Sequence, residues 1–193
     1  MDHGHVRSIR RDHPRWAAGG IEHLVLEVLA YALDESVEGT TRSIDVTVDD
    51  DGSVTVADDG RGTDTRRDES GAWRVKPVMA TPDLRFFAVP SAPPLADGVA
   101  RSGMSVVTAS SAWLEHVNVR GDGAWSARYE RGLPVGTPRA VESGRHGTGT
   151  VVRFLPDPML FGPARVDARA LGALLDGIAS PAHVRLDGQL RGR

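Results

Sequence analysis

Two segments of the sequence contain residue types that could recognise the polar edge of a heteroaromatic base. In residues 58–62 (DDGRG), the carboxylate of Asp58 can accept a hydrogen bond from an exocyclic amine, and two glycines allow the backbone to approach a ligand closely. In residues 147–154 (GTGTVVRF), the hydroxyl of Thr150 could reach a base or a water. Alone, the first segment is more typical of an ordinary Asp-Gly turn, and the second suits a plain strand start equally well.

Two other segments could act at a phosphate. Residues 98–103 (GVARSG) precede an expected helix, and glycines before a helix N-terminus can present backbone N–H groups to phosphate, although a helix cap or linker explains them equally well. Further upstream, one stripe of an expected helix contains Glu27, Tyr31 and Asp34 or Glu35. On its own, that stripe is more typical of a solvated acidic face.

Apolar spacing predicts the elements that would carry these segments. Residues 20–38 repeat apolar side chains at helical spacing, whereas 44–48 and 54–56 alternate around an Asp-Asp-Gly turn, which predicts a helix and then a hairpin. The order of elements favours an α+β sandwich with helices on one face of an antiparallel sheet. The other expected elements are a long loop region at 59–102 with a short strand at 85–89, a helix at 103–111, hairpins at 113–120/124–131 and 140–143/148–155, a helix capped by Asp167 and ending near 178, and a strand at 183–186.

Composition limits the chemistry that the chain can perform. It has 193 residues, 40% of them hydrophobic, no cysteine and a formal net charge of −3. This excludes cysteine nucleophiles and thiolate metal sites and argues against a free-standing nucleic-acid binder. No stretch approaches the ~18 apolar residues of a membrane span, and the N-terminus lacks the apolar core of a secretory signal, so a cytoplasmic location is expected. Residues 1–15, rich in histidine and arginine, are expected to form a solvated basic tail.

The order and spacing of these segments resemble the ATPase domain of gyrase B and topoisomerase IV, which belongs to the Bergerat-fold (GHKL) ATPases. The resemblance runs from about residue 20 to residue 163 and implies a two-layer sandwich of helices and a mixed, mostly antiparallel sheet. It rests on residues 20–28 (GIEHLVLEV), 52–56 (GSVTV), 59–62 (DGRG), 130–134 (ERGLP) and 148–154 (TGTVVRF).

The resemblance also implies roles for individual residues. Glu27 matches the family's general base for attack of water on the γ-phosphate, Asp58 matches the aspartate that binds the adenine amino group, and Thr150 matches the threonine that shares this site through water. A salt bridge at the pocket mouth is implied for Glu35 and Arg61. The other implied nucleotide-binding residues are Gly60 and Gly62 beside the base and ribose, the apolar wall of Val28, Val56, Val78, Met79 and Val152, and Gly98 and Gly103 of the phosphate lid.

Several residues depart from the family's pattern at the phosphate end. Tyr31 stands where the family has an asparagine that binds Mg²⁺; a phenol is a poor neutral ligand for a hard cation, and its ring would crowd the triphosphate. Arg101 and Ala100 stand where the lid has a glycine and a histidine. Lys76 is the only lysine, so nothing local replaces the lysine that the family's transducer domain supplies. We therefore expect little electrostatic stabilisation of phosphoryl transfer.

The resulting prediction is a gyrase-B-like domain that binds ATP, ADP or another adenine nucleotide, with impaired or absent hydrolysis, weak or no Mg²⁺ binding and no assigned metal ligand. It would comprise an N-terminal arm (1–19) and a nucleotide-binding domain (20–193), with no transducer domain. Three alternatives stay open: an active ATPase with an unusual metal arrangement, a serine kinase of the anti-sigma type, and a partner-binding scaffold without nucleotide. A protein partner or homodimer is compatible with this prediction, whereas direct binding to nucleic acid or membrane is not expected.

Overall fold

The computed structural model describes residues 2–67, 69, 71, 73–74, 79–142 and 147–192. Its strands form one large sheet and one separate two-stranded sheet. The strands of the large sheet are β1 (Ser43–Val48), β2 (Val54–Asp58), β5 (Ser111–Arg120), β6 (Gly123–Glu130), β7 (Leu133–Pro134), β8 (Arg139–Ala140), β9 (Gly149–Pro156), β10 (His183–Leu186) and β11 (Gln189–Arg191), and those of the small sheet are β3 (Arg66–Arg67) and β4 (Trp73–Arg74).

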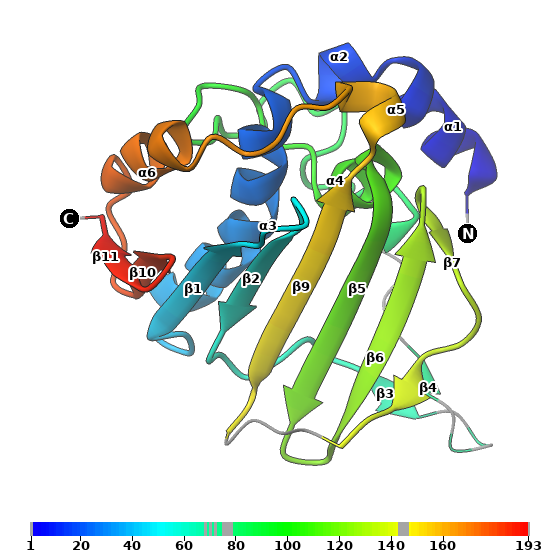
Figure 1. Ribbon diagram of the computed structural model, residues 1–193. Helices are drawn as coiled ribbons and strands as arrows, with labels where there is room; N and C mark the ends of the chain where they lie inside the picture. The colour runs from blue at the N-terminus through cyan, green and yellow to red at the C-terminus, as the bar shows by residue number, and fades with distance from the viewer. Residues whose placement is uncertain are drawn as a thin grey trace.

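The large sheet is mixed and mostly antiparallel. Its strand order is β11-β10-β1-β2-β9-β5-β6-β7, and β8 pairs with β6 (Figure 1). β1 runs parallel to β10 and antiparallel to β2, and β9 lies antiparallel between β2 and β5. This arrangement confirms the expected α+β fold, and it brings β2 and β9, which are far apart in the sequence, side by side.

Helices cover one face of the sheet, and the opposite face of β9, β5 and β6 is turned toward the viewer in Figure 1. The longest helix contacts β2 and the short helix before β5. Within the described residues, no helix is long and apolar enough to cross a membrane. The helices are α1 (His3–Arg11), α2 (His13–Trp16), α3 (Gly20–Val37), α4 (Met104–Ser110), α5 (Pro158–Phe161) and α6 (Ala168–Asp176).

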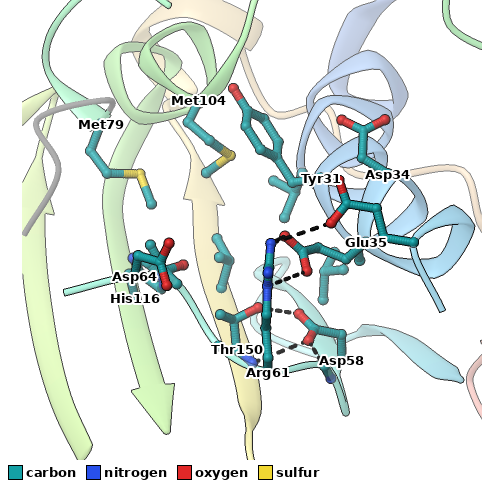
Figure 2. A pocket seen from close by; sticks show the side chains of 18 of the residues that line it. Tyr31, Asp34, Glu35, Asp58, Arg61, Asp64, Met79, Met104, His116 and Thr150 are labelled. Atoms are coloured by element: carbon teal, nitrogen blue, oxygen red, sulfur yellow. Dashed lines mark hydrogen bonds and ion pairs between the residues drawn. The ribbon is translucent and has the colours of Figure 1, made fainter. Parts of the chain in front are cut away.

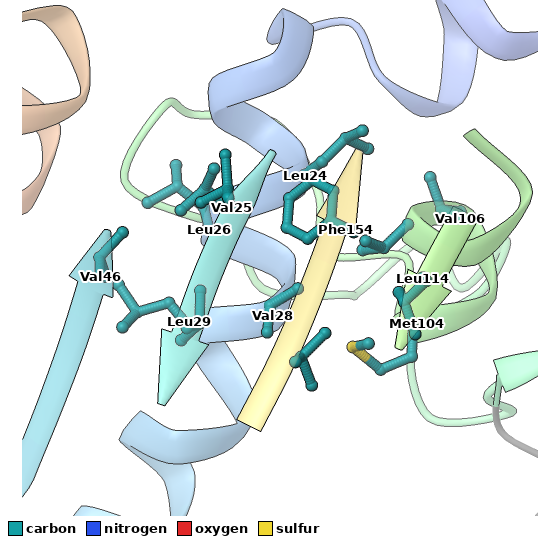
Figure 3. Packing of buried hydrophobic residues seen from close by; sticks show 14 of the residues in the cluster. Leu24, Val25, Leu26, Val28, Leu29, Val46, Met104, Val106, Leu114 and Phe154 are labelled. Atoms are coloured by element: carbon teal, nitrogen blue, oxygen red, sulfur yellow. The ribbon is translucent and has the colours of Figure 1, made fainter. Parts of the chain in front are cut away.

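The core lies between α3 and the sheet. Leu24 and Val28 are one helical turn apart on α3, as are Val25 and Leu29, so both pairs face the strands. Leu24 and Val28 lie toward the fully buried ring of Phe154 in β9, and Leu29 lies toward Val46 in β1, as Figure 3 shows. Removing a ring of this kind from a core costs about 3–5 kcal/mol, so this packing fixes α3 firmly over β2 and β9.

Three of the helices expected from the sequence are confirmed. The 20–38 segment forms α3, the 103–111 segment forms α4, and the last expected helix forms α6. Asp167 caps α6 as predicted, because its carboxylate accepts hydrogen bonds from the backbone N–H groups of Arg169 and Ala170.

The expectation of a solvated basic tail at residues 1–15 is wrong. Residues 3–11 form α1, which buries Val6 and Ile9 and contacts α4. Arg10 donates to Asp157 Oδ2 at 2.7 Å, and that carboxylate is fully buried. Val6 and Ile9 are two apolar residues three positions apart among many charged residues, which is a weak sequence signal for a helix. The helix is stabilised by their burial against residues that are distant in the sequence.

Two strand predictions are also wrong. Residues 84–88 form turns rather than a strand, because the carbonyl oxygen of Asp83 accepts from the N–H groups of both Phe86 and Phe87, at 2.9 and 2.8 Å. The expected 140–143/148–155 hairpin does not form: β8 pairs with β6, while both edges of β9 are taken by β2 and β5. Residues 143–146, part of that expected hairpin, lie outside the described residues.

Candidate functional site

A cavity of about 340 Å³ lies between α3, the strands β2, β5 and β9, and the loop that follows β2. Most of the residues expected at a nucleotide site line it, although they come from five separate segments of the chain. These residues are Val28, Tyr31, Glu35, Val56, Asp58, Gly60, Arg61, Gly62, Met79, Thr150 and Val152.

One end of the cavity presents a carboxylate and a hydroxyl that face each other (Figure 2). Asp58 is the last residue of β2, and Thr150 stands near the start of the neighbouring β9. The Thr150 hydroxyl donates to Asp58 Oδ2, and its backbone N–H lies 3.3 Å from Asp58 Oδ1. Gly60 N–H also donates to Oδ1 at 2.9 Å. The carboxylate is therefore held rigidly, with its negative charge facing an otherwise apolar wall.

The loop after β2 requires glycine at two positions. A Cβ atom at Gly60 would lie 2.5 Å from Thr41 Oγ1, and one at Gly62 would lie 2.7 Å from the Val119 carbonyl oxygen. Gly62 also has a φ of +76°, which side chains rarely adopt. Asn118 anchors the same loop, because its amide accepts from Thr63 N–H at 2.6 Å and donates to the Thr63 carbonyl at 3.1 Å.

Glu35 and Arg61 form the ion pair expected at the pocket mouth. Arg61 Nε lies 2.9 Å from Glu35 Oε2, and its Nη2 lies 3.3 Å from Glu38 Oε2. All three side chains are at least one-third exposed. Exposed pairs of this kind contribute little to stability, so their main effect is to neutralise the arginine at the mouth.

The opposite end of the cavity holds Tyr31 beneath α4. Its hydroxyl donates to Asp83 Oδ2 at 2.9 Å, and burial, together with the Asp83 charge, raises the pKa of this phenol. Asp83 is itself clamped by Arg85, with Nε at 3.0 Å and Nη2 at 2.8 Å from its two oxygens. Burial alone would raise the pKa of Asp83, but the hydrogen bonds from Arg85 and Tyr31 outweigh it and lower that pKa.

Arg101 packs against the ring of Tyr31 in the interior of the protein. Its side chain is 4% exposed, and its guanidinium carbon lies 4.5 Å from the ring centre of Tyr31 and 3.9 Å from that of Phe86. Nη1 donates to Asp34 Oδ2 at 2.8 Å. Arg101, which stands where the family resemblance predicts a lid glycine, is therefore packed between two aromatic rings as part of the interior.

Glu27, the expected general base, does not line the cavity. Its side chain is completely buried, and its two oxygens accept hydrogen bonds from the backbone N–H groups of Ser102 and Gly103, the latter at 2.8 Å. Gly103 is the N-cap of α4 and has a φ of +98°; a Cβ there would lie 3.1 Å from the Tyr31 hydroxyl. The N–H groups that were expected to cradle phosphate are thus donated to a carboxylate of the same chain.

A buried histidine connects Glu27 to the loop before α4. His23 lies one turn earlier on α3, with Nε2 3.4 Å from Glu27 and Nδ1 2.7 Å from Asp97 Oδ2. Burial alone would lower the pKa of His23, but Glu27 and Asp97 outweigh it and raise that pKa. His23 therefore lies between the carboxylates of Glu27 and Asp97 in the interior, outside the lining of the cavity.

The remaining predicted residues fall in three different places. Gly98 lies in an exposed turn outside the lining of the cavity, and Gly103 lies behind Tyr31. Val78 lies outside the described residues. The lining also includes residues that sequence reasoning did not select: Ala32, Asp34, Glu38, Thr63, Asp64, Arg85, Met104 and His116.

His116 is the most unusual of these additional residues. It lies on β5 between the buried Leu114 and Asn118, so strict alternation along the strand could have placed it on the inner face. Its ring is 4% exposed, packs edge-on against Trp125 at 4.9 Å, and has no hydrogen-bond partner at Nδ1 among the described residues. Burial lowers the pKa of His116 to about 4, so it is neutral at pH 7.

This burial predicts an acid-sensitive stability. The unfolded chain takes up a proton at His116 near pH ~6.5, whereas the folded chain does so only near pH 4, so stability falls as the pH drops between these values. From pH ~7 to ~5, the wild type should lose about 2 kcal/mol more unfolding free energy than His116→Leu. Urea unfolding of both proteins at the two pH values measures this difference. Equal losses would show that His116 is protonated in the folded protein.

The phosphate end does not fit a magnesium ion. The hydrogen of the Tyr31 hydroxyl is directed to Asp83, and both Asp83 oxygens are engaged by Arg85. At the other end of the cavity, Asp58 offers a fixed acceptor beside an apolar wall, an arrangement that suits the amino edge of an aminopurine.

Two curated proteins are similar to this chain in sequence. The chain is 36% identical over 181 residues to the B subunit of DNA gyrase from Thermotoga maritima (88% of this chain, 28% of that protein). It is 36% identical over 143 residues to the B subunit of DNA topoisomerase 4 from Enterococcus faecalis (74% of this chain, 21% of that protein). No protein-family model matches the chain.

Two solved structures share the fold. The 43K ATPase domain of Thermus thermophilus gyrase B, solved with an aminocoumarin, has a TM-score of 0.70 and 30% identity over 96% of this chain and 50% of its own. The ATP-binding domain of Francisella tularensis topoisomerase IV, solved with a small-molecule inhibitor, has a TM-score of 0.66 and 27% identity over 85% of this chain and 45% of its own. This chain spans less than a third of the two curated relatives described above. It belongs to the gyrase B and topoisomerase IV B family by its homology and fold, and it corresponds to part of their ATPase domain.

Proposed function

We propose that this chain is a gyrase-B-like domain that binds an adenine nucleotide with impaired or absent hydrolysis. Base recognition is supported by Asp58 and Thr150, which stand together beside an apolar wall at one end of a cavity of suitable size. Asp58 would accept a hydrogen bond from the adenine amino group, and the Thr150 hydroxyl would hold the other side of the base edge through water. The apolar walls from α3, β2 and β9 would hold the ring.

The position of Glu27 is the observation that best supports impaired or absent hydrolysis. A general base must lie within hydrogen-bond reach of the water that it activates. Here its oxygens are occupied by Ser102 N–H and Gly103 N–H, behind the Tyr31 side of the cavity and out of contact with solvent. In an active ATPase, Glu27 would have to leave these two N–H groups, and Arg101 would have to leave its position between Tyr31 and Phe86. That makes the binding role the better supported one.

Calorimetric titration of ADP, with and without Mg²⁺, tests the proposal. Because the phosphate end offers no ligand set for the ion, we expect weak binding whose affinity Mg²⁺ changes by less than about twofold. A strong gain in affinity with Mg²⁺ would show that the metal site is intact. No binding of any adenine ligand would instead favour the scaffold alternative.

A further inference from the structure

We propose that the pocket prefers adenine ligands without phosphate, so that the free base or the nucleoside binds more tightly than the nucleotides and each added phosphate weakens binding. The inference rests on the proposed adenine recognition at Asp58 and Thr150. It concerns the other end of the cavity, where both the charges and the packing oppose a polyanion.

The lining of the cavity is strongly acidic. Among the described residues, five carboxylates and two arginines line it, a formal excess of three negative charges, and two of these carboxylates, Asp34 and Asp64, are paired with Arg101 and Arg120 outside the lining. Both arginines already have carboxylate partners, since Arg61 is paired with Glu35 and Glu38, and Arg85 with Asp83. A phosphate chain that left the base site would therefore meet net negative charge, and every added phosphate increases the repulsion.

Most of the described groups that could offset this repulsion already have partners or lie outside the lining. The guanidinium of Arg101 is enclosed by the rings of Tyr31 and Phe86, and its Nη1 is paired with Asp34. Its Nε and Nη2 have no hydrogen-bond partner among the described residues, but the side chain does not line the cavity. The backbone N–H groups of Ser102 and Gly103 already hold the carboxylate of Glu27. A carboxylate from the chain itself thus occupies the anion donors at this end, and a triphosphate would have to displace it.

An uncharged ligand avoids all of these costs. The cavity of about 340 Å³ lies at the small end of the usual range for small-molecule pockets, roughly 300–1,000 Å³. It offers one fixed polar edge, at Asp58 and Thr150, and apolar side chains from Val28, Val56 and Met79. A flat aminopurine, with or without its ribose, matches this distribution of polar and apolar groups.

Calorimetric titration of the same protein with adenine, adenosine, AMP, ADP and ATP, without Mg²⁺, tests the inference. We expect adenine or adenosine to bind most tightly and ATP at least about tenfold more weakly. Raising the NaCl concentration from about 0.05 to about 0.5 M should strengthen ATP binding several-fold, because salt screens the repulsion. The affinity for adenosine should change by less than about twofold. The adenine and adenosine titrations distinguish recognition of the base alone from recognition of the nucleoside.

A charge variant with a matched control separates local repulsion from overall charge. Glu38→Gln removes one carboxylate from the lining and releases Arg61 from one partner. The variant should therefore narrow the difference in affinity between adenosine and ATP. Glu130→Gln removes the same charge from β6, outside the lining, and should leave the difference unchanged. Tighter binding of ATP than of adenosine would overturn the inference and leave the adenine site standing. Failure of every ligand to bind would overturn the proposed function itself.

Discussion

Replacing Asp58 with alanine should abolish detectable binding of adenine ligands. The carboxylate is the only charged acceptor that we assign to the base edge, and a buried amine left without a partner costs about 1–3 kcal/mol, or roughly 5- to 150-fold in affinity. The same oxygens hold Gly60 N–H and the Thr150 hydroxyl, so the variant also loosens the loop beside the base. From a weak starting affinity, these losses place binding beyond the reach of calorimetric titration.

Asp58→Asn provides the matched control for this experiment. An asparagine can still accept from Gly60 N–H, and it therefore preserves the loop, but its amide would direct N–H groups where the adenine amine needs an acceptor. We expect it to fold with a melting temperature close to that of the wild type and to lose adenosine binding. Unchanged adenosine affinity in both variants would show that the base binds elsewhere.

The sequence predicts the framework of this domain because its signals are local. Apolar residues at helical spacing define α3, and Asp167 marks the start of α6. Asp58 and Thr150 could each be selected from their own segments, but neither segment alone indicates that β2 and β9 pair. Their proximity follows from the family resemblance, and the strand register confirms it.

The parts that could not be predicted depend on contacts between distant residues. On the helical stripe of α3, Glu27 is a plausible catalytic carboxylate, yet a backbone segment some 75 residues later covers it completely. Arg101 stands where the resemblance predicts a lid glycine, but the sequence does not predict that its side chain is buried between Tyr31 and Phe86. Local propensity contains no information about such tertiary packing.

We also expect the isolated chain to release negligible phosphate from ATP, at a rate that does not depend on Glu27. A working general base contributes about 10²–10⁴-fold to a rate, so Glu27→Gln would cause a loss of that size in an active enzyme. Here the carboxylate is held by Ser102 and Gly103, away from any water in the cavity, and the substitution should change the rate by less than about twofold. Phosphate release with and without Mg²⁺, compared for the wild type and this variant, measures the difference.

Tyr31→Asn tests whether the phosphate end can be reopened. The substitution removes the ring that packs on Arg101 and supplies an amide oxygen that suits Mg²⁺, so binding of Mg²⁺-ATP should improve by about tenfold or more. Tyr31→Phe keeps the ring, loses only the hydrogen bond to Asp83, and should bring no such gain. Turnover should stay negligible in both variants, because neither releases Glu27 from the N-terminus of α4. Rapid Mg²⁺-dependent phosphate release from the wild type, lost in Glu27→Gln, would instead show that the buried carboxylate reaches the nucleotide during the reaction and that the chain is a working ATPase.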